Sequence, residues 1–431
     1  MASSGWTNED DRKNTAIEIA SRNEWRRIKA LKARIRVSHF EKKLQQMQDR
    51  YNHLRQLECG VIASGRWDFN ADEIYQMLFM AYVEARPGKR GTYDVQRIES
   101  NLFDNIYRLA VEIAERRYHP LRSETFIVFD PVIREIFAAS FRDRIVHHLI
   151  INICISWWNQ YFVRDSYSCR VGKGTDYGVR RAAHHIGVQT KGYTKRAYFV
   201  KMDIKGFFMS MPREMLFDLA IRGAHQQFHK FGPLGRLLAY LWREVIMDEP
   251  LEQVKVRGKI KNWDDLPRDK SLFFQNAGRG IVIGNLTSQL LSNIFLDALD
   301  KFIIYQLGYH HYGRYVDDFY IVVTEDEVSQ LERDIERIRS YLFTMGLTLH
   351  PHKTRWIDTR RGVDYLGHIL HHGHIEMDRR YQHNYYRALI DVERGLKDIE
   401  TVTSYMGGCV NYGYRKMQQR IWELAGQEFE L

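Results

Sequence analysis

Apolar and polar residues alternate along residues 197–208, AYFVKMDIKGFF, with the period of two that is typical of a β-strand. The side chains at positions 198, 200, 202 and 204 share one face of the predicted strand. Asp203 therefore lies on the opposite face, together with Lys201 and Phe199. The pattern predicts an acidic residue at the end of an apolar strand, followed by a Gly-Phe-Phe turn.

Two later segments carry apolar residues at helical spacing. Apolar pairs recur at 290/291, 294/295, 298/299 and 302/303, and Gly308 ends this predicted helix. The second helix lies within EDEVSQLERDIERIRSYLFTMG and ends at Gly346; its apolar stripe is Val328, Leu331, Ile335, Ile338 and Leu342. We also predict a strand pair around YHHYGRYVDDFYIVV and two short strands over 363–376. The order from 197 to 370 is typical of a split βαβ, ferredoxin-like core.

The N-terminal part of the chain has a helical and strongly basic pattern. Residues 22–56 hold eleven Lys or Arg against three acidic residues. Apolar residues at roughly helical spacing predict one or two basic amphipathic helices, which either pack on the body as ordinary solvated helices or contact RNA. The apolar positions are Ile28, Leu31, Ile35, Leu44, Met47, Tyr51 and Leu54. A loop is predicted over 85–94, between helical sequence from 71 and from 95 to 117.

Composition narrows the class of protein. A chain of 431 residues with 44% hydrophobic and 13% aromatic residues is not mainly disordered and can form two or three modules. The net charge of +10 favours a polyanionic partner, nucleic acid above anionic lipid, over an unspecialised basic protein. The four cysteines form no CxxC pair, and neither a signal peptide nor an apolar run of about 18 residues is present. We therefore expect a cytoplasmic protein without a membrane span.

Two adjacent aspartates, Asp317 and Asp318, lie between residues that predict buried strands. Neighbouring strand residues face opposite sides of a sheet, so both carboxylates can serve one site only near a hairpin turn. Like charges this close repel, and a divalent cation with a preference for oxygen ligands, such as Mg²⁺, would neutralise both. Asp203 could complete a site for two metal ions about 3.5–4 Å apart. Taken alone, VDD is better explained as an exposed acidic turn.

Seven blocks of sequence, in order along the chain, resemble motifs of the reverse transcriptases. They are FRDRIVHH (141–148), DSYSCRVGKGT (165–175), MDIKGFF (202–208), GIVIGNLTSQLLSNIFLDALD (280–300), YVDD (315–318), GLTLHPHKT (346–354) and YLGHIL (365–370). The resemblance implies an α+β right-hand polymerase with fingers, a ferredoxin-like palm and a helical thumb. It implies a basic helical extension over 1–90, fingers over 91–196, a palm over 197–378 with an insertion at 210–279, and a thumb over 379–431.

The resemblance also implies roles for individual residues. Asp203, Asp317 and Asp318 correspond to the catalytic ligands of two Mg²⁺ ions, for which Mn²⁺ can substitute, and Ile204 is included in this metal site. Lys353 matches a lysine proposed to protonate the leaving pyrophosphate; a plain surface lysine is the alternative.

The nucleotide site implied by the resemblance departs from the family pattern. Phe208 matches the steric gate that excludes a 2′-hydroxyl, or is a core phenylalanine. Arg134 matches an arginine that contacts the triphosphate, although the usual Pro-Lys-x-Arg reads Pro-Val-Ile-Arg here. Gly284 and Gln289 also belong to this site. Ile283 stands where many relatives have a glutamine and cannot donate a hydrogen bond, so we expect looser base selection.

Template and primer contacts follow from the same resemblance. Arg170 and Lys173 line the expected template channel or are solvated charges, and Tyr315, Tyr365 and Gly367 belong to the expected primer and template site. The YLGHIL hairpin corresponds to the one that grips the primer. Histidines nearby have no cysteine or acidic partner at ligand spacing, which argues against zinc: His368, His371, His372 and His374. Tyrosines of the expected thumb stack on a duplex or simply pack: Tyr405, Tyr412 and Tyr414.

The expected activity is RNA-directed DNA synthesis, with an RNA template, the cDNA/RNA hybrid and dNTPs as partners. The IGNLTSQ variant at 283–289 is similar to diversity-generating retroelement and defence-associated bacterial enzymes. The long basic N-terminus favours an antiphage defence setting over mutagenic retrohoming. The competing functions are a catalytically silent RNA-binding scaffold and an RNA-dependent RNA polymerase. Phe208 argues against the second of these. A noncoding RNA or accessory protein and a homo- or hetero-oligomeric state are further expectations.

Overall fold

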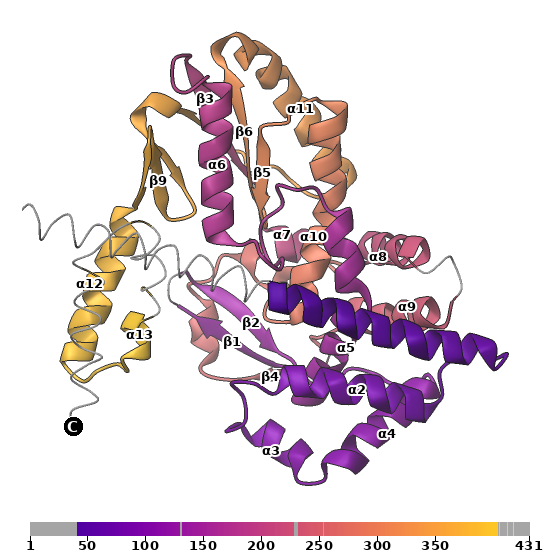
Figure 1. The fold of residues 1–431 in the computed structure, drawn as a ribbon. Helices are drawn as coiled ribbons and strands as arrows, with labels where there is room; N and C mark the ends of the chain where they lie inside the picture. The colour runs from indigo at the N-terminus through magenta and orange to yellow at the C-terminus, as the bar shows by residue number, and fades with distance from the viewer. Residues whose placement is uncertain are drawn as a thin grey trace, which may run out of the picture.

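The computed structural model describes residues 41–129, 132–227, 232–252 and 254–403, together with Tyr405, Tyr412 and Met417. The basic stretch before residue 41 and most of the expected thumb after residue 403, Tyr414 included, lie outside the described residues. Within the described part, three small sheets are combined with a larger number of helices (Figure 1). No helix of this part has the length and apolar character needed to cross a bilayer.

The central sheet has four antiparallel strands in the order β5-β6-β3-β7. These strands are β3 (Ala197–Asp203), β5 (Tyr312–Tyr315), β6 (Asp318–Thr324) and β7 (Arg355–Asp358). Helix α10 (Leu286–Lys301) precedes β5, and α11 (Val328–Thr344) lies between β6 and β7. This connectivity and strand order are those of a split βαβ core, as the sequence predicts. A π-helical turn, η4 (Phe302–Gln306), extends α10 before Gly308.

The alternation along β3 divides its side chains between two hydrophobic cores. Val200 and Met202 belong to the large core that also contains α10 and α11 residues. Ala197 and Phe199 belong to a second core under α6 (Thr175–Gln189), which lies across the other face of the sheet (Figure 1). Because both faces of β3 are covered, a polar residue at its end meets little water.

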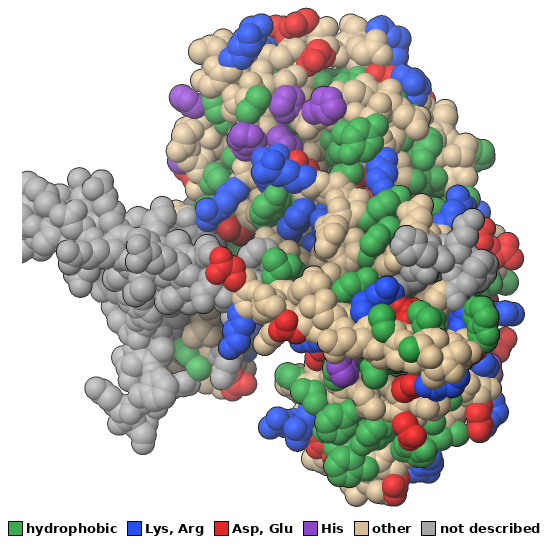
Figure 2. Space-filling model, turned by 45° about the vertical axis from the view of Figure 1, so that its right-hand side comes forward, with side chains coloured by type: hydrophobic (Ala, Val, Ile, Leu, Met, Phe, Trp, Pro, Cys, Tyr) green, Lys and Arg blue, Asp and Glu red, His purple; other side chains and the backbone are tan. Residues whose placement is uncertain are grey.

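Helices form a layer beneath the central sheet. Residues 41–63 are helical, and α5 (Phe141–Tyr161) packs against α2, α8, α9 and α10. The helices of this layer are α2 (Ala71–Ala85), α3 (Tyr93–Glu99), α4 (Leu102–Ala114), α5, α8 (Arg213–Gln227) and α9 (Pro233–Ile246). Asn70 and Glu73 form a capping box that satisfies backbone amides where α2 begins. At the lower end of the molecule, where α3 and α4 lie, large hydrophobic side chains stay exposed, among them Tyr93, Phe103 and Tyr107 (Figure 2).

Two smaller sheets flank the central one. The outer sheet has the order β2-β1-β4, from β1 (Glu124–Val128), β2 (Arg134–Ala138) and β4 (Lys255–Val256). The hairpin sheet has the order β10-β9-β8, from β8 (Val363–Tyr365), β9 (His368–His371) and β10 (His374–Met377). The remaining elements are α7 (Phe207–Ser210), η1 (Ile260–Trp263), η2 (Arg268–Lys270), η3 (Leu272–Phe274), η5 (Glu325–Glu327), η6 (Thr359–Arg361), α12 (Arg379–Glu393) and α13 (Glu400–Thr403).

The hairpin sheet corrects one expectation from the sequence. Two strands were expected over 363–376, and the structure has three. Tight turns with positive φ at Leu366, Gly367 and Gly373 divide the segment into short strands. Strands of three or four residues are too short for the alternation of polar and apolar residues to reveal their number.

A fully buried ion pair joins α10 to the central sheet. Arg314 of β5 donates to both carboxylate oxygens of Asp300, at 2.6 and 2.7 Å, and neither side chain is exposed to solvent. Tyr312 also donates to Asp300. A third guanidinium bond, 2.9 Å long, reaches the carbonyl oxygen of Val316. Buried charges are tolerated only when their hydrogen bonds are satisfied, as they are here.

Removing one partner of this pair should destabilise the fold strongly. We expect Asp300→Ala to lower the free energy of unfolding by roughly 3–5 kcal/mol, because Arg314 would keep a buried charge without its partner. Denaturant unfolding followed by circular dichroism measures the change. The matched control is Glu336→Ala, which removes the exposed pair with Arg339 and should cost under about 1 kcal/mol. Equal losses in the two variants would contradict this account.

Candidate active site

Three carboxylates meet at one end of the central sheet. Asp203 is the last residue of β3, and it pairs in register with Asp318, the first residue of β6. Tyr315 pairs with Asp318 on the other side, so Val316 and Asp317 form a two-residue hairpin turn. The structure thus brings Asp203 together with the Asp317-Asp318 pair, which begins 114 positions later in the sequence. Val316 has φ of +57°, an uncommon value for a β-branched residue.

The end of β3 is held in place by the segment that follows α11. The amide of His350 donates to the carbonyl of Asp203 at 2.8 Å, and the amide of Lys205 donates to Thr348 at 2.9 Å. This pairing places Lys353 beside the carboxylates, with its Nζ 2.6 Å from Oδ2 of Asp203. Burial lowers the pKa of Lys353, but the hydrogen bond and the nearby aspartates outweigh it and the net pKa is raised. Lys353 therefore stays protonated.

A second lysine, which has no predicted role from the sequence, forms an ion pair with Asp318. Lys201 lies 3.1 Å from Oδ2 of Asp318. Lys201 precedes Asp203 by two residues on β3, so it faces the same side of the sheet. The alternation along the strand had placed it there, and this was the signal that could have identified it.

The carboxylates repel one another despite the two lysines. Burial, followed by the charge of Asp203, raises the pKa of Asp317 to about 7. Burial also raises the pKa of Asp318, and Lys201 offsets part of that shift. The carboxyl groups of Asp317 and Asp318 therefore lose their protons less readily than usual. A divalent cation bound between the carboxylates would remove this repulsion, and oxygen ligands of this kind suit such an ion. The side chain of Ile204 is buried in the large core, so only its backbone carbonyl could add to such a site.

The expected nucleotide residues lie on segments that touch one another. The amide of Ile281 donates to the carbonyl of Phe208 at 2.9 Å, and the amide of Phe137 donates to the carbonyl of Ile283 at 2.8 Å. Gly284 has φ of +125°, and a Cβ there would lie 2.5 Å from the carbonyl oxygen of Phe137. Only glycine allows this close approach of the 283–284 segment to β2.

The side chains of the remaining expected nucleotide residues differ in exposure. Phe208 is half-buried and packs on Phe207, with ring centroids 5.2 Å apart. Ile283 packs on the small cluster of Phe137, Met209 and Leu272. Arg134, the first residue of β2, and Gln289, in the first turn of α10, are exposed.

Arg170 and Lys173 make internal contacts. The guanidinium of Arg170 donates to the carbonyl oxygens of Asn159, Val163 and Ser166 at 2.6–3.0 Å. It therefore secures the loop after α5. Lys173 donates to the carbonyl of Arg164, and burial, then the charge of Arg170, lowers the pKa of Lys173 to about 7.

The three expected primer and template residues of the central and hairpin sheets differ in their surroundings. The hydroxyl of Tyr315 lies 3.5 Å from that of Thr175, at the edge of the site. Tyr365 is fully buried between Phe199 and Tyr320, so its ring does not face the solvent as a primer contact would require. Gly367 has φ of +77°, and its carbonyl accepts from the amide of Asp378 at 3.0 Å, which links the hairpin sheet to α12.

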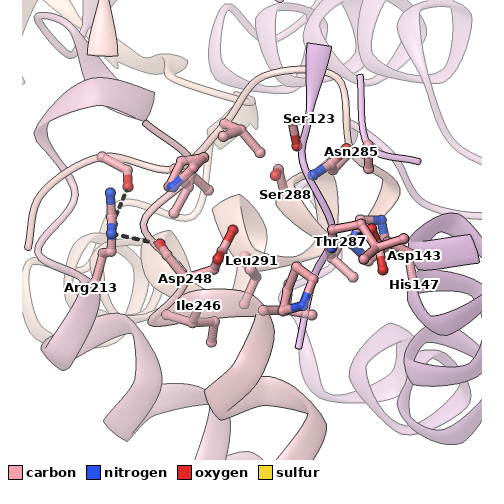
Figure 3. A pocket seen from close by; sticks show the side chains of 18 residues that line it. Ser123, Asp143, His147, Arg213, Ile246, Asp248, Asn285, Thr287, Ser288 and Leu291 are labelled. Carbon is pink, nitrogen blue, oxygen red and sulfur yellow. Dashed lines mark hydrogen bonds between the residues drawn. The ribbon is translucent and has the colours of Figure 1, made fainter. Parts of the chain in front are cut away.

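A pocket of about 40 Å³ is lined in part by residues of the 281–288 segment (Figure 3). None of the three aspartates lines it. Its wall includes Asp143 and His147 of α5, Thr287 and Ser288. The Nδ1 atom of His147 and the hydroxyl of Thr287 are buried without a protein hydrogen-bond partner among the described residues. Space of this size and polarity suits one or a few water molecules rather than a nucleotide.

Comparison with known families identifies the class of protein. The family profile described as reverse transcriptase (RNA-dependent DNA polymerase) matches residues 133–370, more than half of the chain. The chain belongs to the reverse transcriptase family, whose members are RNA-directed DNA polymerases that generally use divalent metal ions. No curated protein matches the chain.

Several solved structures are similar to the chain. A telomerase from Candida albicans, in complex with a TWJ fragment of telomeric RNA, has a TM-score of 0.44 and 13% identity, over 73% of this chain and 56% of that one. An apo telomerase from Candida tropicalis has a TM-score of 0.44 and 12% identity, over 68% and 52%. A form truncated from its C-terminal domain has a TM-score of 0.42 and 12% identity, over 60% and 55%. The chain thus spans little more than half the length of these structures.

The buried histidine predicts a specific response to acid. Burial, then the charge of Arg144, lowers the pKa of His147 to about 3. Between the ordinary pKa of 6.5 and 3, the unfolded chain binds a proton that the folded chain does not. The free energy of unfolding is therefore not reduced by His147 above pH 6.5. Below pH 6.5 it falls by up to about 1.4 kcal/mol for each pH unit, until the pH reaches the folded-state pKa of about 3.

His147→Leu should therefore flatten the fall in unfolding free energy between pH 6 and pH 4. Denaturant unfolding at several pH values measures the slope. His310→Leu, at an exposed position, is the matched control and should keep the wild-type slope. A His147→Leu slope equal to that of wild type would show that the imidazole is protonated in the folded state.

Proposed function

We propose that the chain is an active RNA-directed DNA polymerase that copies an RNA template into cDNA from dNTPs. The observation that carries this proposal is the register of β3 and β6, which sets Asp203 opposite Asp318 beside the turn residue Asp317. A scaffold without catalysis has no need for three carboxylates placed so closely that the pKa values of Asp317 and Asp318 are raised. The net charge of +10 supports a nucleic-acid partner.

The three aspartates would hold two Mg²⁺ ions. When bound, such a pair makes a primer 3′-hydroxyl a better nucleophile and stabilises the pyrophosphate that leaves. Lys353, protonated and at the edge of the same site, is placed to give a proton to the pyrophosphate once its contact with Asp203 is exchanged for the substrate. Lys201 would keep neutralising Asp318 from the strand interior.

Other residues would bind and select the nucleotide. The half-buried ring of Phe208 would pack against the sugar and exclude a 2′-hydroxyl. Arg134, exposed at the start of β2, would contact the triphosphate. Ile283 contributes packing and no hydrogen bond, so selection of the base would depend on shape and base pairing.

We propose antiphage defence as the biological setting, with a noncoding RNA or an accessory protein as partner. The support is the basic segment over 1–60, which is longer than diversity-generating enzymes generally have. Mutagenic retrohoming is the second candidate, and the IGNLTSQ variant at 283–289 favours it. A template repeat with an accessory gene beside the coding gene would decide for the second candidate.

Loss of a carboxylate should abolish synthesis without unfolding the protein. We expect Asp203→Asn, Asp317→Asn and Asp318→Asn each to lower dNTP incorporation at least about a thousandfold, about 4 kcal/mol of transition-state stabilisation. Primer extension on an RNA template measures the rate, and circular dichroism checks the fold. Asp364→Asn, the same change at an exposed position of β8, should keep wild-type activity. A fully active Asp317→Asn, Asp318→Asn double variant would end this proposal.

Shrinking Phe208 should open the site to ribonucleotides. We expect Phe208→Val to lower the ratio of kcat/KM for a dNTP to that for the matching rNTP by at least about tenfold, because space appears beside the 2′ position. The control is Phe207→Leu, which alters the buried neighbour and should leave the ratio unchanged. If Phe208→Val incorporates dNTPs and keeps the wild-type ratio, the gate lies elsewhere.

A further inference from the structure

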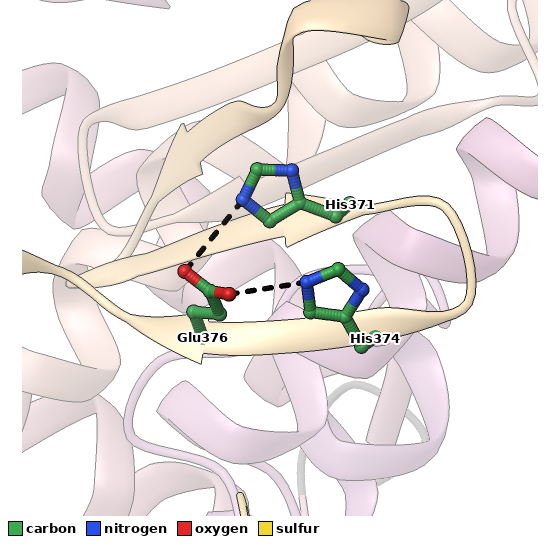
Figure 4. Close-up of side chains that lie close together, drawn as sticks. All are labelled: His371, His374 and Glu376. Carbon is green, nitrogen blue, oxygen red and sulfur yellow. Dashed lines mark hydrogen bonds and ion pairs between the residues drawn. The ribbon is translucent and has the colours of Figure 1, made fainter.

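The hairpin of β9 and β10 carries two histidines and a glutamate whose side chains converge (Figure 4). The nearest ligand atoms of His371, His374 and Glu376 all lie within 4.8 Å of one another. The sequence predicted no acidic partner at ligand spacing for the histidines of this segment. That expectation is wrong, because Glu376 is the partner.

The backbone register brings the three residues together. His374 of β10 lies directly opposite His371 of β9 in the antiparallel pair. Glu376 follows His374 by two residues and therefore faces the same side of the hairpin. The turn at His372-Gly373, where Gly373 has φ of +79°, fixes this register. The convergence therefore follows from the strand pairing and would persist through side-chain motion.

The surroundings of His371 orient its ring. A Cβ at Gly362 would lie 2.7 Å from Cε1 and 3.0 Å from Nδ1 of His371, so the imidazole packs on a backbone that has no side chain. Its Nε2 atom is turned to Glu376, 3.8 Å from Oε2. The ring of His374 stacks on it at 4.8 Å with an interplanar angle of 13°, and its Nε2 lies 3.1 Å from Oε1 of the same glutamate.

Two imidazole nitrogens and one carboxylate are a common ligand set for zinc. A tetrahedral zinc ion with bonds of roughly 2.0–2.2 Å holds its ligand atoms roughly 3.3 Å apart. The Nε2 atom of His374 lies 3.1 Å from Oε1 of Glu376, and that of His371 lies 3.8 Å from Oε2. The three ligand atoms lie within 4.8 Å of one another, so small side-chain rotations would bring them to the zinc spacing. The set differs from the aspartate centre, which offers oxygen atoms and suits Mg²⁺.

We propose that His371, His374 and Glu376 bind one Zn²⁺ ion, with water at the fourth position. The side chains are 32%, 57% and 49% exposed, so an ion and its water can enter without rearrangement of the core. The ion would clamp β9 to β10 near the turn. The same hairpin sheet is bonded to the start of α12 through Gly367 and Asp378, so zinc would stiffen the link between the central sheet and the C-terminal helices.

The test uses tag-free, full-length protein that has been stripped with a chelator and dialysed into excess Mg²⁺, which occupies the aspartate centre. Titration with ZnCl₂ in a calorimeter should show one zinc per chain. His374→Ala and Glu376→Gln should each weaken binding at least about tenfold. His372→Gln is the matched control: its ring packs on Tyr193, with centroids 4.4 Å apart, and the variant should bind as wild type does.

Two further measurements keep the result unambiguous. Co²⁺ in place of zinc should give the visible absorption of a four-coordinate site in wild type and His372→Gln, and not in Glu376→Gln. Asp317→Asn should bind zinc normally, so failure of the polymerase proposal and failure of this one are distinguishable. Three results would each overturn the assignment. Wild type could fail to bind zinc, Glu376→Gln and His374→Ala could bind zinc as tightly as wild type does, or His372→Gln could lose as much affinity as those two variants.

Discussion

The buried pair of Arg314 and Asp300 is the interaction on which the end of the sheet that carries the three aspartates depends. The guanidinium joins α10 to β5 and also holds the carbonyl of Val316, the turn residue with positive φ. The backbone of Arg314 pairs with residues 165 and 167 at the sheet edge. An unfavourable turn conformation of this kind costs about 1–3 kcal/mol and persists only where the surroundings impose it. The pair thereby supports the turn that sets Asp317 beside Asp203.

Sequence alone predicted the parts of this site that follow from periodicity. Alternation along β3 put Asp203 and Lys201 on one face, and the hairpin around VDD placed two carboxylates near a turn. The order of elements was sufficient for the split βαβ core, because each helix and strand carried its own apolar pattern. Asp300 was not found, because one acidic residue in a helix is indistinguishable from a solvated position unless its partner is known.

Residue type alone could not distinguish side chains that face solvent from side chains that bond or pack within the protein. Arg170 suits RNA phosphates equally well, yet its bonds go to three carbonyl groups of its own loop. The ring of Tyr365 is packed in the second core. Glu376 was missed for a related reason: with two strands in place of three, its face relative to His371 could not be deduced. In each case a long-range or short-strand pairing decides the role.

The segment at 283–284 shows how two departures from the family pattern are physically connected. Phe137 of β2 bonds to the carbonyl of Ile283, and Gly284 fits against the carbonyl of Phe137. Because β2 begins at Arg134, the arginine expected at the triphosphate and the residue expected at the base lie on two segments that are bonded to each other. Hydrophobic packing of Ile283 on Phe137, Met209 and Leu272 also holds the two segments together. The position of the incoming nucleotide would then depend on the rigidity of the outer sheet more than on polar contacts from the motif itself.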